Sequence, residues 1–80
     1  MSSPRRLAIP RRVSVSAAQD GRPLQVADQP VESVRESWLV EDRWWTDRPV
    51  RRHYWEVVTA SGRNEVVFCD LASGRWWRQR

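Results

Sequence analysis

The stretch that decides the fold is Val50-Arg51-Arg52-His53-Tyr54-Trp55-Glu56-Val57-Val58-Thr59, followed by the turn Ser61-Gly62-Arg63 and by Glu65-Val66-Val67-Phe68-Cys69. Valine, tyrosine, tryptophan and threonine favour β-strands, and the glycine suits a turn. The two segments therefore predict a β-hairpin. Successive side chains of a strand point to opposite faces, and both faces of the second strand are apolar. A flat open sheet would leave one of these faces in water, so the sheet must curl or be covered.

Four more segments predict strands on either side of this hairpin: residues 13–17, 24–26, 31–40 and 75–79. Asp20-Gly21 predicts a tight turn between the first two of these strands, and Asp28-Gln29-Pro30 is expected to break the chain again. Residues 31–40 fit helical spacing as well as strand spacing, and we favour a strand because strands surround them. Residues 41–49 are expected to form a charged connection.

The sequence as a whole predicts a small all-β domain over residues 11–80. We expect an antiparallel meander of about five to six strands, curled into a barrel or a two-layer sheet. Residues 1–10 contain two prolines and two arginines, and they predict a flexible basic arm.

Composition excludes several function classes. The chain has 80 residues with one cysteine and one histidine, so it can form no internal disulfide and no ordinary zinc set. We expect no metal and no cofactor. No apolar run approaches the roughly 18 residues of a membrane span, and the N-terminus lacks the apolar stretch of a secretory signal. We therefore expect a cytoplasmic protein without membrane contact.

The net charge of +4 is concentrated near the N-terminus. All fourteen basic residues are arginine, and residues 1–12 carry four of them without an acid. Residues 31–80 carry nine arginines and eight acids, so this part is almost neutral. That balance weakens the case for a strong electrostatic footprint on nucleic acid.

Six tryptophans lie between Trp38 and Trp77, interleaved with arginine. We expect Trp38, Trp55 and one member of the pair Trp76-Trp77 to be in the core, because these residues lie within strands beside aliphatic residues. The other member of that pair should face outward. The candidate partner-binding residues are Trp44, Trp45, Trp76, Trp77, Arg43, Arg51, Arg52 and Arg75.

Catalysis has little support in the sequence. A cysteine–histidine nucleophile would need Cys69 beside His53 on adjacent strands, which the predicted hairpin allows. No third group is suggested that would orient the histidine, and a cysteine in such an apolar strand is usually a small buried residue. We expect no enzymatic activity.

Trp38, Trp44-Trp45, Arg52-His53-Tyr54-Trp55, Gly62, Phe68-Cys69-Asp70 and Ser73-Gly74-Arg75-Trp76-Trp77-Arg78-Gln79 occur in an order that resembles a small bacterial domain of uncharacterised function. That domain is found free-standing and as the C-terminal tail of the Y-family-polymerase-like subunit of bacterial mutasomes (the ImuB type). The resemblance covers roughly residues 13–80. It implies a non-catalytic module in DNA repair or SOS mutagenesis that holds protein partners together, such as polymerase or mutasome components.

Three functional hypotheses remain open at this point. The first is a protein-interaction module accessory to DNA repair and translesion synthesis. The second is a single-stranded nucleic-acid binder whose tryptophans stack on bases while its arginines meet phosphates. The third is a structural or dimerisation unit.

Overall fold

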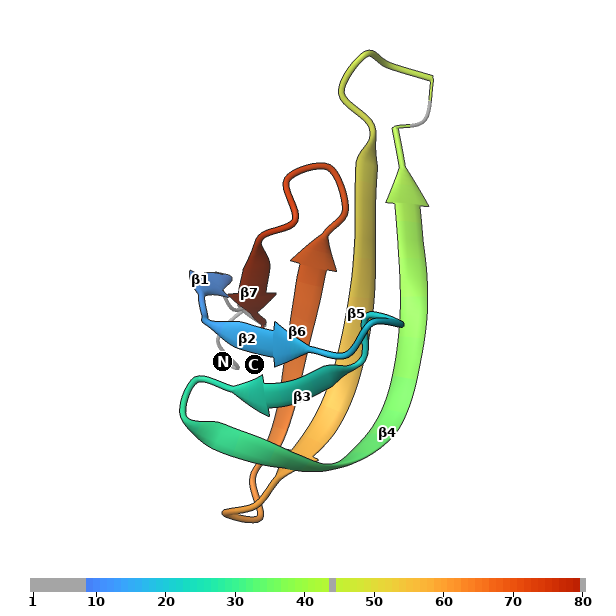
Figure 1. The fold of residues 1–80 in the computed structure, drawn as a ribbon. Helices are drawn as coiled ribbons and strands as arrows, with labels where there is room; N and C mark the ends of the chain where they lie inside the picture. The colour runs from blue at the N-terminus through green and yellow to red at the C-terminus, as the bar shows by residue number, and fades with distance from the viewer. Residues whose placement is uncertain (1–8, 44, 80) are drawn as a thin grey trace, which may run out of the picture.

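The computed structural model describes residues 9–43 and 45–79, and these form seven β-strands without a helix. All neighbouring strands are antiparallel, and the sheet order is β1-β7-β6-β5-β4-β3-β2. The sheet curls into a half-barrel (Figure 1). The strands are β1 (Arg11–Arg12), β2 (Val15–Ala17), β3 (Pro23–Val26), β4 (Gln29–Asp42), β5 (Val50–Thr59), β6 (Asn64–Asp70) and β7 (Trp76–Arg78).

The all-β prediction is confirmed, and each of the six predicted strands has a counterpart from β2 to β7. The two-residue strand β1 was not predicted; it pairs with β7 and gives the sheet a seventh strand. Eight of the ten residues in the predicted flexible arm, residues 1–8, lie outside the described residues.

Strand β4 starts earlier than predicted, because the turn before it consists of Ala27 and Asp28. Gln29 and Pro30 were expected to break the chain, but they already pair with β3. Proline is tolerated there because it lies near the start of the strand, and its carbonyl accepts a hydrogen bond from the Ala60 amide at 2.8 Å. The strand also continues to Asp42, which shortens the predicted connection.

Two irregularities in pairing bend β4, one between Val31 and Ser33 and one between Val34 and Glu36. Each places an extra residue of β4 against β5, as a β-bulge does, and bulges increase the local bend and twist of a strand. Figure 1 shows the result: one half of β4 runs beside β5, and the other half curves across the front of β5 and β6 to meet β3. The hairpin β2–β3 is thereby carried across one face of the sheet, which we call the inner face.

The core lies between this hairpin and the inner face of β5 and β6. Val26 from β3 packs with Trp55, Val57 and Val67, and all four are buried. Five partly buried residues pack against this core: Val13, Val15, Val31, Val34 and Trp76.

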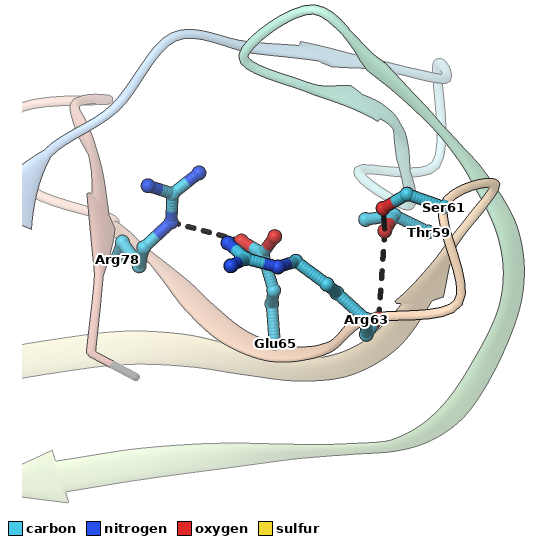
Figure 2. Close-up of polar contacts among 5 residues, drawn as sticks. All are labelled: Thr59, Ser61, Arg63, Glu65 and Arg78. Atoms are coloured by element: carbon cyan, nitrogen blue, oxygen red, sulfur yellow. Dashed lines mark hydrogen bonds and ion pairs between the residues drawn. The ribbon is translucent and has the colours of Figure 1, made fainter.

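Polar groups close the end of the core at the β5–β6 turn (Figure 2). The buried Glu65 carboxylate accepts a hydrogen bond from Arg78 Nε at 2.8 Å. Thr59 is fully buried, and its hydroxyl lies 3.0 Å from that of Ser61 and 3.5 Å from the Arg63 carbonyl. These contacts supply partners for polar groups that would otherwise be costly to bury.

Candidate protein-interaction surface

Four aromatic side chains form a continuous row across the outer face of the sheet. Pairing places Trp38 opposite Tyr54, Tyr54 opposite Phe68, and Phe68 opposite Trp77, so all four share one face. The Trp38 and Tyr54 rings are stacked with centroids 5.4 Å apart and planes 4° apart. Tyr54 and Phe68 lie 4.8 Å apart, and Phe68 and Trp77 lie 6.5 Å apart. We call these four residues the outer row.

Two guanidinium groups lie against the outer row. Arg12 lies over the Trp77 ring at 5.4 Å, and Arg52 lies over the Phe68 ring at 4.7 Å. Arg52 also donates a hydrogen bond to the Tyr54 hydroxyl at 3.3 Å. Phe68 is only 2% exposed in consequence, although it faces away from the core. The ring faces in the middle of the row are therefore occupied by other parts of the same chain.

The exposed end of the outer row is Trp38, on the β4–β5 hairpin. Trp38 is 37% exposed, and its neighbour Leu39 is 52% exposed on the opposite face of the strand. The prediction that Trp38 belongs to the core is wrong, because pairing with Tyr54 turns it to the outer face at an edge of the sheet. Trp45, in the loop that closes the hairpin, is 66% exposed. Three of the large exposed apolar side chains of the described residues thus lie on one hairpin.

The loop of this hairpin has some internal order. Arg43 adopts a positive φ of 55°, and its carbonyl accepts hydrogen bonds from both the amide and the hydroxyl of Thr46, at 3.0 and 2.8 Å. The Thr46 hydroxyl in turn accepts a hydrogen bond from the Arg48 amide at 3.1 Å. These contacts hold a turn directly beside the exposed Trp45.

The predicted partner-binding residues do not form one surface. Arg43 and Trp45 lie in the hairpin loop, and Trp44 lies outside the described residues. Arg52 and Trp77 belong to the outer face, which identifies Trp77 as the outward member of its pair. Arg51 lies in β5 of the same hairpin, where it pairs with Glu41 at 3.1 Å, whereas Trp76 packs against the core and Arg75 is exposed in the β6–β7 loop.

Sequence reasoning missed the exposed Leu39 and the participation of Tyr54 and Phe68 in the outer row. The alternation of side chains along β5 and β6 was available as a signal, since it separates Tyr54 from Trp55. To predict the outer row, one would also need to know which residues of the four strands lie opposite one another.

His53 and Cys69 are directly opposite each other on β5 and β6. The His53 ring stacks on Trp55 with centroids 4.3 Å apart. Burial, aided by the negative charge of Asp70, raises the pKa of the Cys69 thiol. A cysteine nucleophile needs a lowered pKa, so this thiol is poorly suited to catalysis at neutral pH.

Ligand sites of other kinds have little basis in the described residues. No group of three or more histidine, cysteine, aspartate or glutamate side chains there could hold a metal ion. An open groove of about 370 Å³ lies between β3 and β4 beside Leu24 and Val31. No helix in the described part of the chain is long and apolar enough to cross a membrane.

The closing motif of the chain has a structural role. The Asp70 carboxylate accepts hydrogen bonds from the Ala72 amide at 2.9 Å and the Ser73 amide at 3.4 Å. Gly74 has a positive φ of 74° and donates its amide to the Asp70 carbonyl at 2.7 Å. This loop directs Trp76 to the core and Trp77 to the outer face.

No family model, curated protein or solved structure matches the chain.

Proposed function

We propose that this protein is a non-catalytic protein-interaction module that binds its partners through the β4–β5 hairpin. The observation that carries this proposal is that one hairpin bears three large apolar side chains, each more than one third exposed: Trp38 on its outer face, Leu39 on its inner face and Trp45 in its loop. Exposed tryptophan beside arginine is the composition enriched at the energetic centres of protein–protein interfaces. The resemblance to the mutasome tail supports a cytoplasmic role in bacterial DNA repair or translesion synthesis.

Direct binding of single-stranded nucleic acid is the competing function, and the outer row argues against it. A base-stacking platform offers open ring faces to successive bases. Here Tyr54 and Trp77 stack on their neighbours, and the guanidinium groups of Arg12 and Arg52 already lie on aromatic rings. Strand β4 also carries four acids and one arginine, which would repel a phosphate backbone.

The test compares protein partners with single-stranded nucleic acid as ligands of the same purified chain. Mutasome components of the host, purified one at a time, are passed over the immobilised chain in an interferometry measurement. We expect at least one component to bind, and we expect Trp45→Ala to weaken that binding at least tenfold. Leu71→Ala is the matched control, because Leu71 is 42% exposed and lies in the β6–β7 loop, which joins β5 through the Leu71 amide and the Arg51 carbonyl but carries none of the three exposed side chains of the hairpin.

Two results would contradict the proposal. One is the absence of binding to every mutasome component by a folded chain. The other is quenching of tryptophan fluorescence by a single-stranded oligonucleotide with an affinity that falls steeply as salt rises, which would establish the competing function.

A further inference from the structure

Strand β4 presents a long edge to its surroundings. From Val31 to Asp42 it pairs with β5 on one side, whereas β3 reaches only Gln29 and Pro30 on the other. In the described part of the chain, no strand therefore lies on the second side of β4 between Val34 and Asp42. Backbone groups of alternate residues point toward that side, where a further strand would satisfy them.

This edge has a short unprotected stretch, Ser37 to Val40. Proteins protect edge strands with proline, bulges or charges at the exposed positions. In β4 these protective features lie on either side of that stretch, which has no charge, no proline and no bulge. The bulges of β4 end at Glu36, and from there to Asp42 the pairing with β5 is regular and contains no proline. The middle of this regular stretch is Trp38 and Leu39, both exposed and apolar. An added strand would bury them.

We propose that the strand added at this edge is β4 of a second copy of this chain, antiparallel to the first, with the two-fold axis passing through Trp38. The inference rests on the proposed function, because it names the chain itself as one partner of the β4–β5 hairpin. Opposing residues of antiparallel strands share a face, so a two-fold axis between identical strands must pass through a residue, not between two.

Charge favours Trp38 over its four neighbours Arg35, Glu36, Ser37 and Leu39 as the axis position, and an axis through Val40 would pair only the five residues from Trp38 to Asp42. An axis through Arg35 or Glu36 would place that charged residue opposite its own copy. An axis through Ser37 would oppose Glu32 and Asp42, and an axis through Leu39 would oppose Glu36 and Asp42. Like charges directly opposite each other destabilise a sheet.

The axis through Trp38 opposes no like charges between Val34 and Asp42. It brings Arg35, the extra residue of the second bulge, near Glu41 of the second copy, which carries the opposite charge. Glu36 lies opposite Val40, and Ser37 lies opposite Leu39. The strand is therefore self-complementary in this register alone among the five centred between Arg35 and Leu39.

The aromatic side chain on the axis fits the same arrangement. One face of the Trp38 ring stacks on Tyr54, so its other face is turned away from β5 toward the edge. A second Trp38 placed opposite at the edge would meet this face. The outer rows of the two copies would then join into one row across a continuous sheet, and the side chain would lose most of its 37% exposure.

Disulfide trapping tests the register. In a Cys69→Ser background, Trp38→Cys places two thiols on residues about 4.5–5.5 Å apart between Cα atoms, within the range that a disulfide spans. Val40→Cys is the matched control on the same face. In the proposed register its two copies are four residues out of line, roughly 13 Å apart. We expect at least tenfold more covalent dimer from Trp38→Cys in the same glutathione buffer.

Sedimentation of the unmodified chain tests the association itself. We expect a reversible monomer–dimer equilibrium whose dissociation constant rises at least tenfold with Leu39→Lys. Leu71→Lys, which adds the same charge at an exposed leucine outside the edge, should leave the constant unchanged. Circular dichroism checks that each variant is folded. If Leu39→Lys does not fold, the disulfide comparison alone tests the proposed dimer.

The contrary outcomes are specific. A folded chain that stays monomeric up to millimolar concentration overturns the proposal, and so does equal trapping at positions 38 and 40. The function as a protein-interaction module would survive either result if the monomer bound a mutasome component through Trp45. A dimer that binds no such component would instead leave the inference standing and contradict the proposed role in repair.

Discussion

Replacement of Phe68 by alanine tests whether the outer row is a second packed layer of this small domain. Phe68 faces away from the core, yet it is 2% exposed, because Tyr54, Trp77 and Arg52 cover its ring. If this burial is equivalent to burial in the core, the substitution should destabilise the domain as strongly as a core substitution does.

The expected loss follows from the buried area. An aromatic side chain buries about 150–250 Å², which at about 25 cal/mol per Å² corresponds to roughly 4–6 kcal/mol as an upper bound. Substitutions of this type cost about 3–5 kcal/mol in practice. An 80-residue domain has a free energy of unfolding of only about 4–12 kcal/mol, at about 0.05–0.15 kcal/mol per residue. Phe68→Ala should therefore leave the domain close to unfolding.

Phe68→Leu is the comparison that separates burial from ring stacking. Leucine keeps much of the apolar volume but removes two ring contacts and the cation–π contact with Arg52, so we expect a loss of about 1–2 kcal/mol. Urea unfolding followed by far-ultraviolet circular dichroism measures both variants. A loss below about 1 kcal/mol for Phe68→Ala would refute the second layer. Equal losses for the two variants would show that stacking, not burial, dominates.

The remaining predictions use the same unfolding assay or a thiol assay. Trp55→Ala should lower the free energy of unfolding by about 3–5 kcal/mol, because that ring is in the core. Trp45→Ala should lower it by less than about 0.5 kcal/mol, because that ring is mostly exposed. Similar losses would contradict the division between core and contact residues. Arg78→Ala should lower the free energy of unfolding by about 3 kcal/mol, because it leaves the buried Glu65 carboxylate without its partner. Arg51→Ala, which breaks a half-exposed ion pair, should lower it by less than about 1 kcal/mol. The reverse order would contradict the view that burial determines the value of these two ion pairs. Since burial raises the pKa of Cys69, its folded-state thiol should react with iodoacetamide more slowly at pH 8 than in denaturant, where the reactive thiolate is more abundant. Equal rates of alkylation in the folded and the denatured chain would contradict the raised pKa of Cys69.

Local sequence was sufficient to predict the strands because their signals are local. Alternation in Val15–Ala17, the glycine turns at Gly21 and Gly62, and the run Val50–Thr59 each identify an element without knowledge of its partner. Alternation also required one member of Trp76-Trp77 to face outward. It could not decide which one, because that depends on how the loop from Asp70 to Gly74 enters β7.

The candidate site was harder to predict because it depends on register. The apolar neighbours Leu39 and Val40 favour a core position for Trp38, but the bulges of β4 and the pairing of Trp38 with Tyr54 determine which face it occupies. The outer row needs four strands in the correct alignment, and no local pattern specifies that. The strand β1 contains only Arg11 and Arg12, too short a segment to give an alternating signal.

The pairing of β1 with β7 places the first and the last strand of the sheet side by side (Figure 1). Arg11 lies directly opposite Arg78, so a short peptide linker from β7 to β1 would not stretch the sheet. New ends could then be opened at the β5–β6 turn, where Gly62 is exposed, to give a circular permutant. The same geometry would allow this domain to be inserted into a surface loop of another protein, entering and leaving the host at neighbouring points.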